Sequence, residues 1–206
     1  MTVLERKERE FQQREDQILA AALSLFNRDD WQTVTIDQIA AKAEIGKGTI
    51  YKHFESKDEI YARLVVNFFS GIQEKIKTRD TTKPVLDQIA GVMRTFWESF
   101  QGRPDYRRLE RYCRRDDFRK TVGAKMAREL DALDEGFMAV LDPLIQLGLA
   151  EGVLEPRPAE FIHLAMHAAV IGLLEIEGGA CGGDGIPPET AFKEICEFTL
   201  RGISKR

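Results

Sequence analysis

The sequence is poor in the residues that stabilise small extracellular folds and membrane spans. Only three of its 206 residues are cysteines, Cys113, Cys181 and Cys196, and they form no C-x-x-C pair. This spacing argues against a disulfide framework and a zinc site, so we expect free thiols. The longest apolar run, AAVIGLL at 168–174, is far shorter than the roughly 20 residues of a membrane helix. Because the charged N-terminus also lacks the apolar core of a signal peptide, we expect a cytoplasmic protein with no membrane partner.

Signals for β-strands are equally scarce. Nearly every apolar stretch repeats with a period near 3.6, which predicts an all-α fold of about nine helices. Pro143 lies inside one predicted helix and should kink or split it. The predicted helices are 14–28, 35–43, 47–53, 57–77, 84–101, 104–113, 118–149, 157–177 and 188–203.

The chain has no overall basic character, because its net charge is −4, so a nucleic-acid surface must be local. Residues 42–57 carry four lysines and two glutamates, a net charge of +2. This segment includes the sequence GKGT at 46–49. GKGT does not fit a nucleotide-binding loop, because Gly48 separates the lysine from Thr49 and a helix, not a strand, precedes it.

The same segment does fit a helix-turn-helix. The helix at 35–43 begins with a capping box, in which the Thr35 hydroxyl and the Gln38 side chain cap each other's backbone. A short turn follows, and then a helix at 47–53. We expect its outward face to meet phosphates or base edges through Lys47, Thr49, Tyr51, Lys52 and His53, with Ile39, Ile45, Ile50 and Phe54 pointing inward. The alternative is a pair of packed helices with a solvated lysine face.

Residues 33–64, TVTIDQIAAKAEIGKGTIYKHFESKDEIYARL, resemble the DNA-binding signature of the TetR family of bacterial transcriptional regulators. The resemblance implies a homodimer that binds double-stranded operator DNA and responds to a ligand. Residues 1–56 would form the helix-turn-helix domain, and 57–206 the effector-binding and dimerisation domain. Bases would lie nearest Lys47, Gly48 and Thr49. The phosphate backbone would be met by Tyr51 and His53, by the helix caps Thr35 and Lys57, and by Lys52, which also suits base contact.

Two positions depart from the family pattern. Glu44 stands where family members have Gly, and a left-handed turn there would cost Glu about 1 kcal/mol. Gly46 stands where Ser or Thr is common, which is a weaker helix cap. Both departures concern the turn of the helix-turn-helix.

The larger predicted domain is rich in aromatic residues and methionine, which suit a cavity for an apolar ligand as well as an ordinary core. We expect a small hydrophobic effector, such as a fatty acyl compound, with Arg94 or an arginine of 107–115 holding its head group. A planar cationic drug is the rival effector. The predicted lining residues are Phe96, Trp97, Phe100, Tyr112, Phe137 and Met166.

The last two helices are the predicted dimer interface. The final helix carries one apolar stripe, and the helix before it has small residues that allow close packing. The alternative is that the stripe packs within its own chain. The interface residues predicted here are Ala165, Ala168, Ala169, Gly172, Phe192, Ile195, Cys196, Thr199 and Ile203.

Other functions have weaker support in the sequence. No nucleophile elbow or dinucleotide fingerprint occurs, so we expect no enzyme and no cofactor. His163 and His167 have the spacing of two metal ligands, but nearby partners are missing, so a structural or pocket role is expected. The remaining alternatives are a redox-sensing regulator that uses Cys181, and a helical module whose basic helix binds a protein or a membrane instead of DNA.

Overall fold

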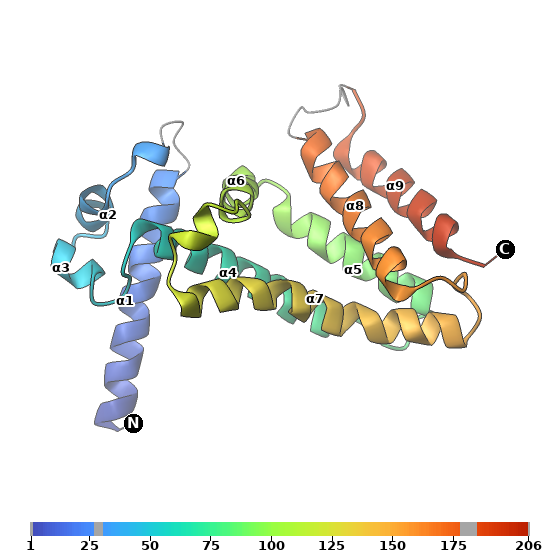
Figure 1. Cartoon of the computed structure of the whole chain (residues 1–206), viewed down its shortest axis with the longest axis horizontal. Helices are drawn as coiled ribbons and strands as arrows, with labels where there is room; N and C mark the ends of the chain where they lie inside the picture. Colours follow the sequence, from blue (N-terminus) through green and yellow to red (C-terminus); the bar gives the residue numbers. More distant parts are fainter. Residues whose placement is uncertain (1, 27–30, 178–184, 206) are drawn as a thin grey trace. The chain divides into compact units, whose positions relative to one another are not determined.

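The computed structural model of the chain describes residues 2–26, 31–177 and 185–205 (Figure 1). Within these ranges the chain forms nine α-helices, two short 3₁₀ helices and no strand, which confirms the predicted all-α class. No described helix has the length and apolar character that crossing a membrane requires. The helices are α1 (Val3–Phe26), α2 (Ile36–Lys42), α3 (Lys47–Ile50), α4 (Lys57–Lys77), α5 (Val85–Phe100), α6 (Pro104–Cys113), α7 (Ala124–Ala150), α8 (Ala159–Glu177) and α9 (Pro188–Ile203), with η1 (Trp31–Thr33) and η2 (Phe118–Lys120).

The chain divides into two compact units. The first comprises Met1–Phe68 and Asp105–Asp131, and the second comprises Phe69–Pro104 and Ala132–Arg206. Helices α4 and α7 each begin in the first unit and end in the second. The predicted boundary after residue 56 separates a DNA-binding domain from an effector-binding and dimerisation domain, and this functional division stays a prediction.

Most helix bounds agree with the sequence pattern, and the differences have local causes. Helices α4 and α9 have their predicted bounds, because a Ser56 cap precedes the first and Pro187 the second. Helix α1 begins eleven residues earlier than predicted, in a segment whose exposed side chains carry mixed charge. The predicted helix at 118–149 is divided into η2 and α7. Pro143 does not split α7, because buried Leu141, Leu144 and Ile145 hold both sides of it in the core.

The core of the first unit joins α1 to the start of α4. Ile18 and Phe26 of α1 are fully buried, as is Tyr61 of α4. The Phe26 ring lies 4.3 Å from the Trp31 ring and 5.2 Å from the Tyr61 ring. Trp31, itself buried, therefore closes this small core.

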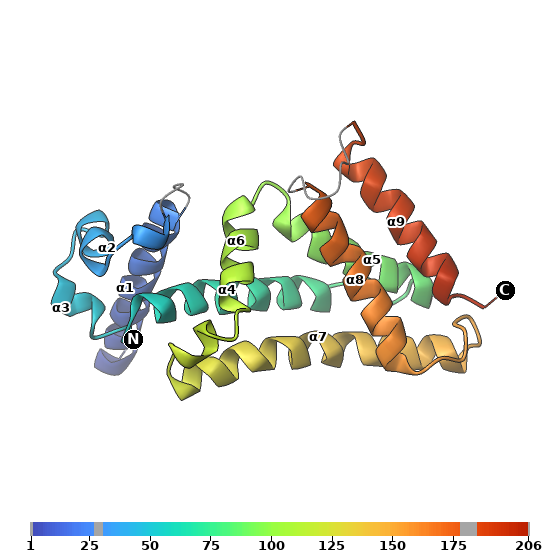
Figure 2. The same ribbon diagram turned by 45° about the horizontal axis from the view of Figure 1, so that its top comes forward.

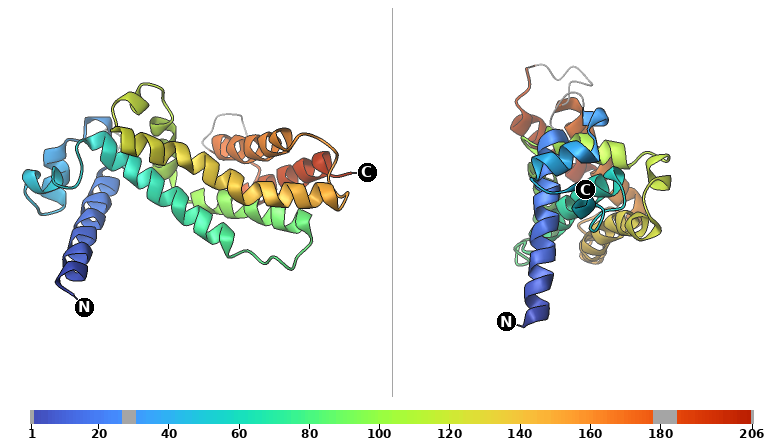
Figure 3. Two further views of the ribbon diagram at one scale, coloured as in Figure 1. Left: turned by 60° about the horizontal axis from the view of Figure 1, so that its bottom comes forward. Right: turned by 90° about the vertical axis from the view of Figure 1, so that its left-hand side faces the viewer.

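In the second unit, α5 packs against both α8 and α9, which themselves lie side by side (Figure 2). The Trp97 indole of α5 stacks on Phe192 of α9 at 4.5 Å. The second half of α4 lies beside α7, where the Gln73 side chain donates to the Leu133 carbonyl at 3.1 Å (Figure 3). Gly136 permits this approach, since a Cβ there would lie 2.3 Å from Gln73 Nε2.

The predicted interface stripe of α9 is wrong in its main members. Phe192, Cys196 and Ile203 are buried within the chain, and Cys196 Sγ lies 3.9 Å from Met93 Sδ of α5. The sequence alternative, packing within the same chain, therefore holds for them. The predicted residues Ala165 and Ala168 of α8 are exposed, and α8 and α9 also expose three large apolar side chains that were not predicted, Phe161, Leu164 and Phe198.

Candidate nucleic-acid interface

The N-terminus of α2 is built by the predicted capping box. Thr35 Oγ1 accepts from the Gln38 backbone N–H at 3.2 Å, and Gln38 Oε1 accepts from the Thr35 backbone N–H at 2.8 Å. Two donors that a helix start leaves open are thereby satisfied. Thr35 is exposed, so the cap fixes the start of α2 on an accessible surface.

The turn between α2 and α3 contains the one described non-glycine residue with a left-handed backbone. Glu44 has φ of 55°, as the family resemblance implied for this position. Its N–H donates to the Ala41 carbonyl, and the next N–H, of Ile45, donates to the Ala40 carbonyl. These two bonds close the end of a helix in the way that usually favours glycine. The conformation is therefore strained for Glu.

Helix α3 is shorter than predicted, but its last turn continues beyond it. The α-helix proper covers Lys47–Ile50, while the N–H groups of Lys52 and His53 bond back to Thr49 and Ile50. The predicted inward residues Ile50 and Phe54 are buried, whereas Ile45 is half-buried. The Gln17 side chain of α1 also donates to the Ala43 carbonyl at 2.9 Å, which ties α1 to the turn.

Five of the residues predicted to meet DNA bases or phosphates are exposed or half-exposed. Lys47, Gly48 and Lys52 are exposed, Thr49 is half-buried, and 51% of Tyr51 is accessible. These residues present amines, hydroxyls and, at Gly48, a backbone without a side chain on one accessible segment. Such groups donate to phosphate oxygens and to acceptors on base edges.

An unpredicted carboxylate shares this surface. Lys47 Nζ lies 2.9 Å from Asp37 Oδ1 of α2, and this pair raises the pKa of Lys47 through a hydrogen bond and Coulomb attraction. Asp37 is ten residues away in the sequence, so the contact depends on the angle between α2 and α3, which the sequence does not show. Lys57, the other predicted cap, donates to the Gln32 carbonyl at 2.9 Å.

The predicted outward orientation of His53 is wrong. Only 6% of its side chain is exposed. The ring lies 4.1 Å from the Phe11 ring of α1, and its Nδ1 atom lies 3.8 Å from Glu15 Oε1. The sequence pattern missed Phe11 because α1 was expected to begin at residue 14.

The residues predicted to line an effector cavity fall into different groups. Phe96, Phe100 and Phe137 meet in the second unit, where Phe96 lies 5.3 Å from each of the other two rings. Phe69 of α4 joins them, 5.9 Å from Phe100 and from Phe137. We call these four residues the phenylalanine cluster; Phe69 is a member that the sequence analysis missed.

Three predicted lining residues lie outside that cluster. Trp97 faces Phe192 of α9, and Met166 is buried on α8. Tyr112 belongs to the first unit, where its hydroxyl donates to Asp58 Oδ1 at 3.1 Å and its ring lies 5.0 Å from Trp31. Tyr112 and the phenylalanine cluster therefore belong to different units. Tyr112 follows Arg111 in an amphipathic helix whose buried face is not visible from the sequence alone.

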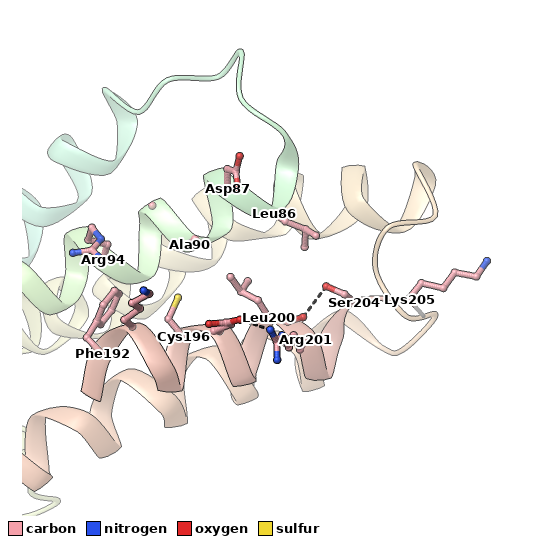
Figure 4. Close-up of a pocket in the computed structure, with 13 residues that line it drawn as sticks. Leu86, Asp87, Ala90, Arg94, Phe192, Cys196, Leu200, Arg201, Ser204 and Lys205 are labelled. Carbon is pink, nitrogen blue, oxygen red and sulfur yellow. Dashed lines mark hydrogen bonds and ion pairs between the residues drawn. The ribbon is translucent and has the colours of Figure 1, made fainter. Parts of the chain in front are cut away.

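A separate groove of about 830 Å³ runs between α5 and α9 (Figure 4). Leu86, Ala90 and Leu200 line it with apolar atoms, and Arg94 lies at one end. Arg94 is held by Glu189 at 2.7 Å and stands 4.7 Å over the Phe192 ring. None of the six predicted lining residues lines this groove, whereas Arg94, a residue predicted to hold the effector's head group, does.

The side chains considered for metal or redox chemistry are not assembled for it. His163 and His167 stack at 6.3 Å, and the described residues hold no cluster of three or more His, Cys, Asp or Glu with metal-binding geometry. Burial raises the pKa of the Cys113 and Cys196 thiols, which lowers their thiolate fraction. Cys181, the predicted redox residue, lies outside the described residues.

Residues 18–64 match the family model described as bacterial regulatory proteins, tetR family. Over 139 residues the chain is 22% identical to the HTH-type transcriptional repressor NicS of Pseudomonas putida, a match that covers 67% of this chain and 64% of NicS. The chain thus spans about two thirds of that relative's length.

Two solved structures are similar to this one over nearly their whole length. A TetR family transcriptional regulator from Vibrio parahaemolyticus superposes with a TM-score of 0.68, at 22% identity, over 94% of this chain and 100% of that one. The transcriptional regulator FadR from Bacillus subtilis, solved in complex with stearoyl-CoA, superposes with a TM-score of 0.70, at 17% identity, over 91% and 98%. At these identities the likeness concerns the fold.

Proposed function

Because this chain belongs to the TetR family of bacterial regulatory proteins, which regulate transcription and are not enzymes, we propose that it is a ligand-responsive repressor. It binds a palindromic operator as a homodimer, and a small hydrophobic effector releases it. We propose repression instead of activation because the relative NicS is a transcriptional repressor.

The main support for DNA binding is the accessible face of residues 47–53, which we call the α3 segment. Lys47, Tyr51 and Lys52 are exposed there, next to the backbone of Gly48, in a segment whose net charge is positive although the whole chain is negative. In a helix-turn-helix protein this segment enters the major groove. We assign phosphate contacts to Tyr51 and Lys52, and base contacts to Lys47, Gly48 and Thr49. Thr35 and Lys57 hold the flanking helices against the backbone of the DNA.

The exposed apolar side chains of α8 and α9 support a second copy as partner. Phe161, Leu164 and Phe198 are each more than half exposed, which is unfavourable in water unless another surface covers them. Two copies that pack these helices together form a four-helix interface. A twofold dimer then presents two α3 segments to half-sites about 34–36 Å apart, or further if the dimer is wide.

The effector is assigned to the second unit and to the apolar class. In the phenylalanine cluster, the Phe69 and Phe96 rings each lie within about 6 Å of the other three rings, and such an aromatic surface suits a hydrocarbon ligand. The FadR structure contains stearoyl-CoA, which supports a fatty acyl compound for this chain. Release follows if the effector binds more tightly to a dimer whose α4 helices are spaced wrongly for DNA.

Selection of bound sequences from random double-stranded DNA tests the proposal. We expect the full chain to enrich one palindrome, and its binding to weaken steeply as salt is raised because counterions are released. A helical module that binds proteins would enrich none, and that result would reject the DNA-binding function. A redox-sensing regulator would instead lose operator affinity after peroxide treatment, and a Cys181→Ser variant would resist that treatment.

A further inference from the structure

The end of the α3 segment, residues 47–53, packs against the first half of α1. Phe11 lies there, and its ring centroid is 4.1 Å from that of His53 at an angle of 32°. Glu15, one turn further along α1, lies 3.8 Å from His53 Nδ1. We call Phe11, Glu15 and His53 the α1 clamp. All three residues belong to the first unit.

The α1 clamp contacts the end of the α3 segment, whose helix is too short to be stable on its own. Helix α3 has four residues, and isolated helices of that length are unstable in water. Its orientation must therefore come from tertiary contacts. Ile50 and Phe54 supply them from the core side, and His53 supplies one toward α1. His53 follows Tyr51 and Lys52 directly, so its position limits where their side chains point.

The imidazole itself is poorly placed for a phosphate. Its side chain is almost fully buried, and Nδ1 has no hydrogen-bond partner because Glu15 is too far away to accept. The ring's face is covered by Phe11. On its Nδ1 side His53 therefore contributes aromatic packing and no hydrogen bond.

We propose that Phe11 and His53 position the α3 segment, and that His53 is a positioning residue rather than a phosphate ligand. The proposal deepens the function given above and rests on it. It also assigns a role to the part of α1 that extends before residue 14. The side chains of that part are exposed and add nothing to the core of the first unit, but Phe11 packs against the segment that carries Tyr51 and Lys52.

Three variants separate positioning from phosphate binding. His53→Phe keeps an aromatic ring against Phe11 but has no donor, so affinity for the selected palindrome should stay within about twofold of wild type. His53→Ala and Phe11→Ala should each weaken binding about fivefold to tenfold. The double variant should be no weaker than either single one, because each change removes the same contact. Leu4→Ala, on the same helix and 79% exposed, is the matched control and should bind as wild type.

The opposite results overturn the proposal. A His53→Phe variant as weak as His53→Ala indicates a polar contact with DNA. Additive effects of Phe11→Ala and His53→Ala indicate two independent roles. Thermal unfolding of every variant checks that the fold persists, and affinities are compared at a temperature where all are folded. If wild type binds no DNA sequence, the proposed function fails before the positioning role is reached.

Discussion

Lys47 Nζ, on the helix proposed to enter the major groove, lies 2.9 Å from Asp37 Oδ1 on the helix before it. The pair is half exposed, so a phosphate or a base competes with Asp37 for the ammonium group. Asp37→Asn should therefore strengthen operator binding about threefold, which is the scale of an exposed ion pair. Fluorescence anisotropy with labelled operator measures this. Asp16→Asn, which removes a charge of α1 that forms no described ion pair, is the control. Equal binding by Asp37→Asn and wild type would show that Lys47 does not exchange partners.

The left-handed residue in the turn gives a prediction about stability. Glu44 has φ of 55°, and a residue with a Cβ is strained there by about 1 kcal/mol. Glu44→Gly should therefore raise the free energy of unfolding by about 1 kcal/mol, measured by urea denaturation. Glu44→Ala removes the charge but keeps the Cβ, so it should gain little. A gain of the same size in both variants would assign the effect to charge instead of backbone strain.

The Tyr112–Asp58 contact predicts a fall in stability at alkaline pH. Burial, together with the nearby Asp58 carboxylate, raises the pKa of Tyr112 to about 12. In the unfolded chain a tyrosine ionises near pH 10. As pH rises from about 10 to 12 the unfolded state loses this proton first, so the free energy of unfolding falls across that window. The contribution is fully present below pH 10.

Tyr112→Phe tests this assignment. Loss of the hydrogen bond to Asp58 should cost about 1 kcal/mol at pH 7. Above pH 10 the variant should fall less steeply than wild type. It should still fall somewhat, because burial also raises the pKa of Tyr61. Urea denaturation at pH 8, 10 and 11 gives the comparison, and identical slopes for the two proteins would contradict it.

The exposed apolar face of α8 and α9 predicts the effect of a charge there. Phe198 is 71% exposed, and in a dimer it would be buried. Phe198→Glu should therefore convert the dimer to a monomer, because an unpaired carboxylate is costly in an apolar interface. Leu147→Glu places the same charge on an exposed apolar site of α7 and should leave the dimer intact. Sedimentation velocity distinguishes the two states, and a dimeric Phe198→Glu variant would place the interface elsewhere.

Sequence reasoning succeeded where the signal is local. The capping box at Thr35 and Gln38, the bounds of α4, and the strained turn at Glu44 each depend on neighbouring residues, and each is confirmed. The predictions were wrong where a residue far away in the sequence determines whether a side chain is buried. His53 is buried by Phe11, which is 42 positions earlier, and Cys196 is turned inward by Met93 of α5. A helical stripe indicates which residues share a face, but it does not identify what covers that face.

Operator affinity of the Lys47→Ala, Tyr51→Phe double variant tests the central claim most directly. Both side chains stand on the exposed face of the α3 segment, so their loss should weaken binding to the selected palindrome at least tenfold. The salt dependence of binding should also lose about one counterion for each copy of the chain, because Lys47 no longer meets the DNA. Lys75→Ala, an exposed lysine at the far end of α4, should bind as wild type. Unchanged affinity and salt dependence in the double variant would contradict the claim that this segment contacts DNA.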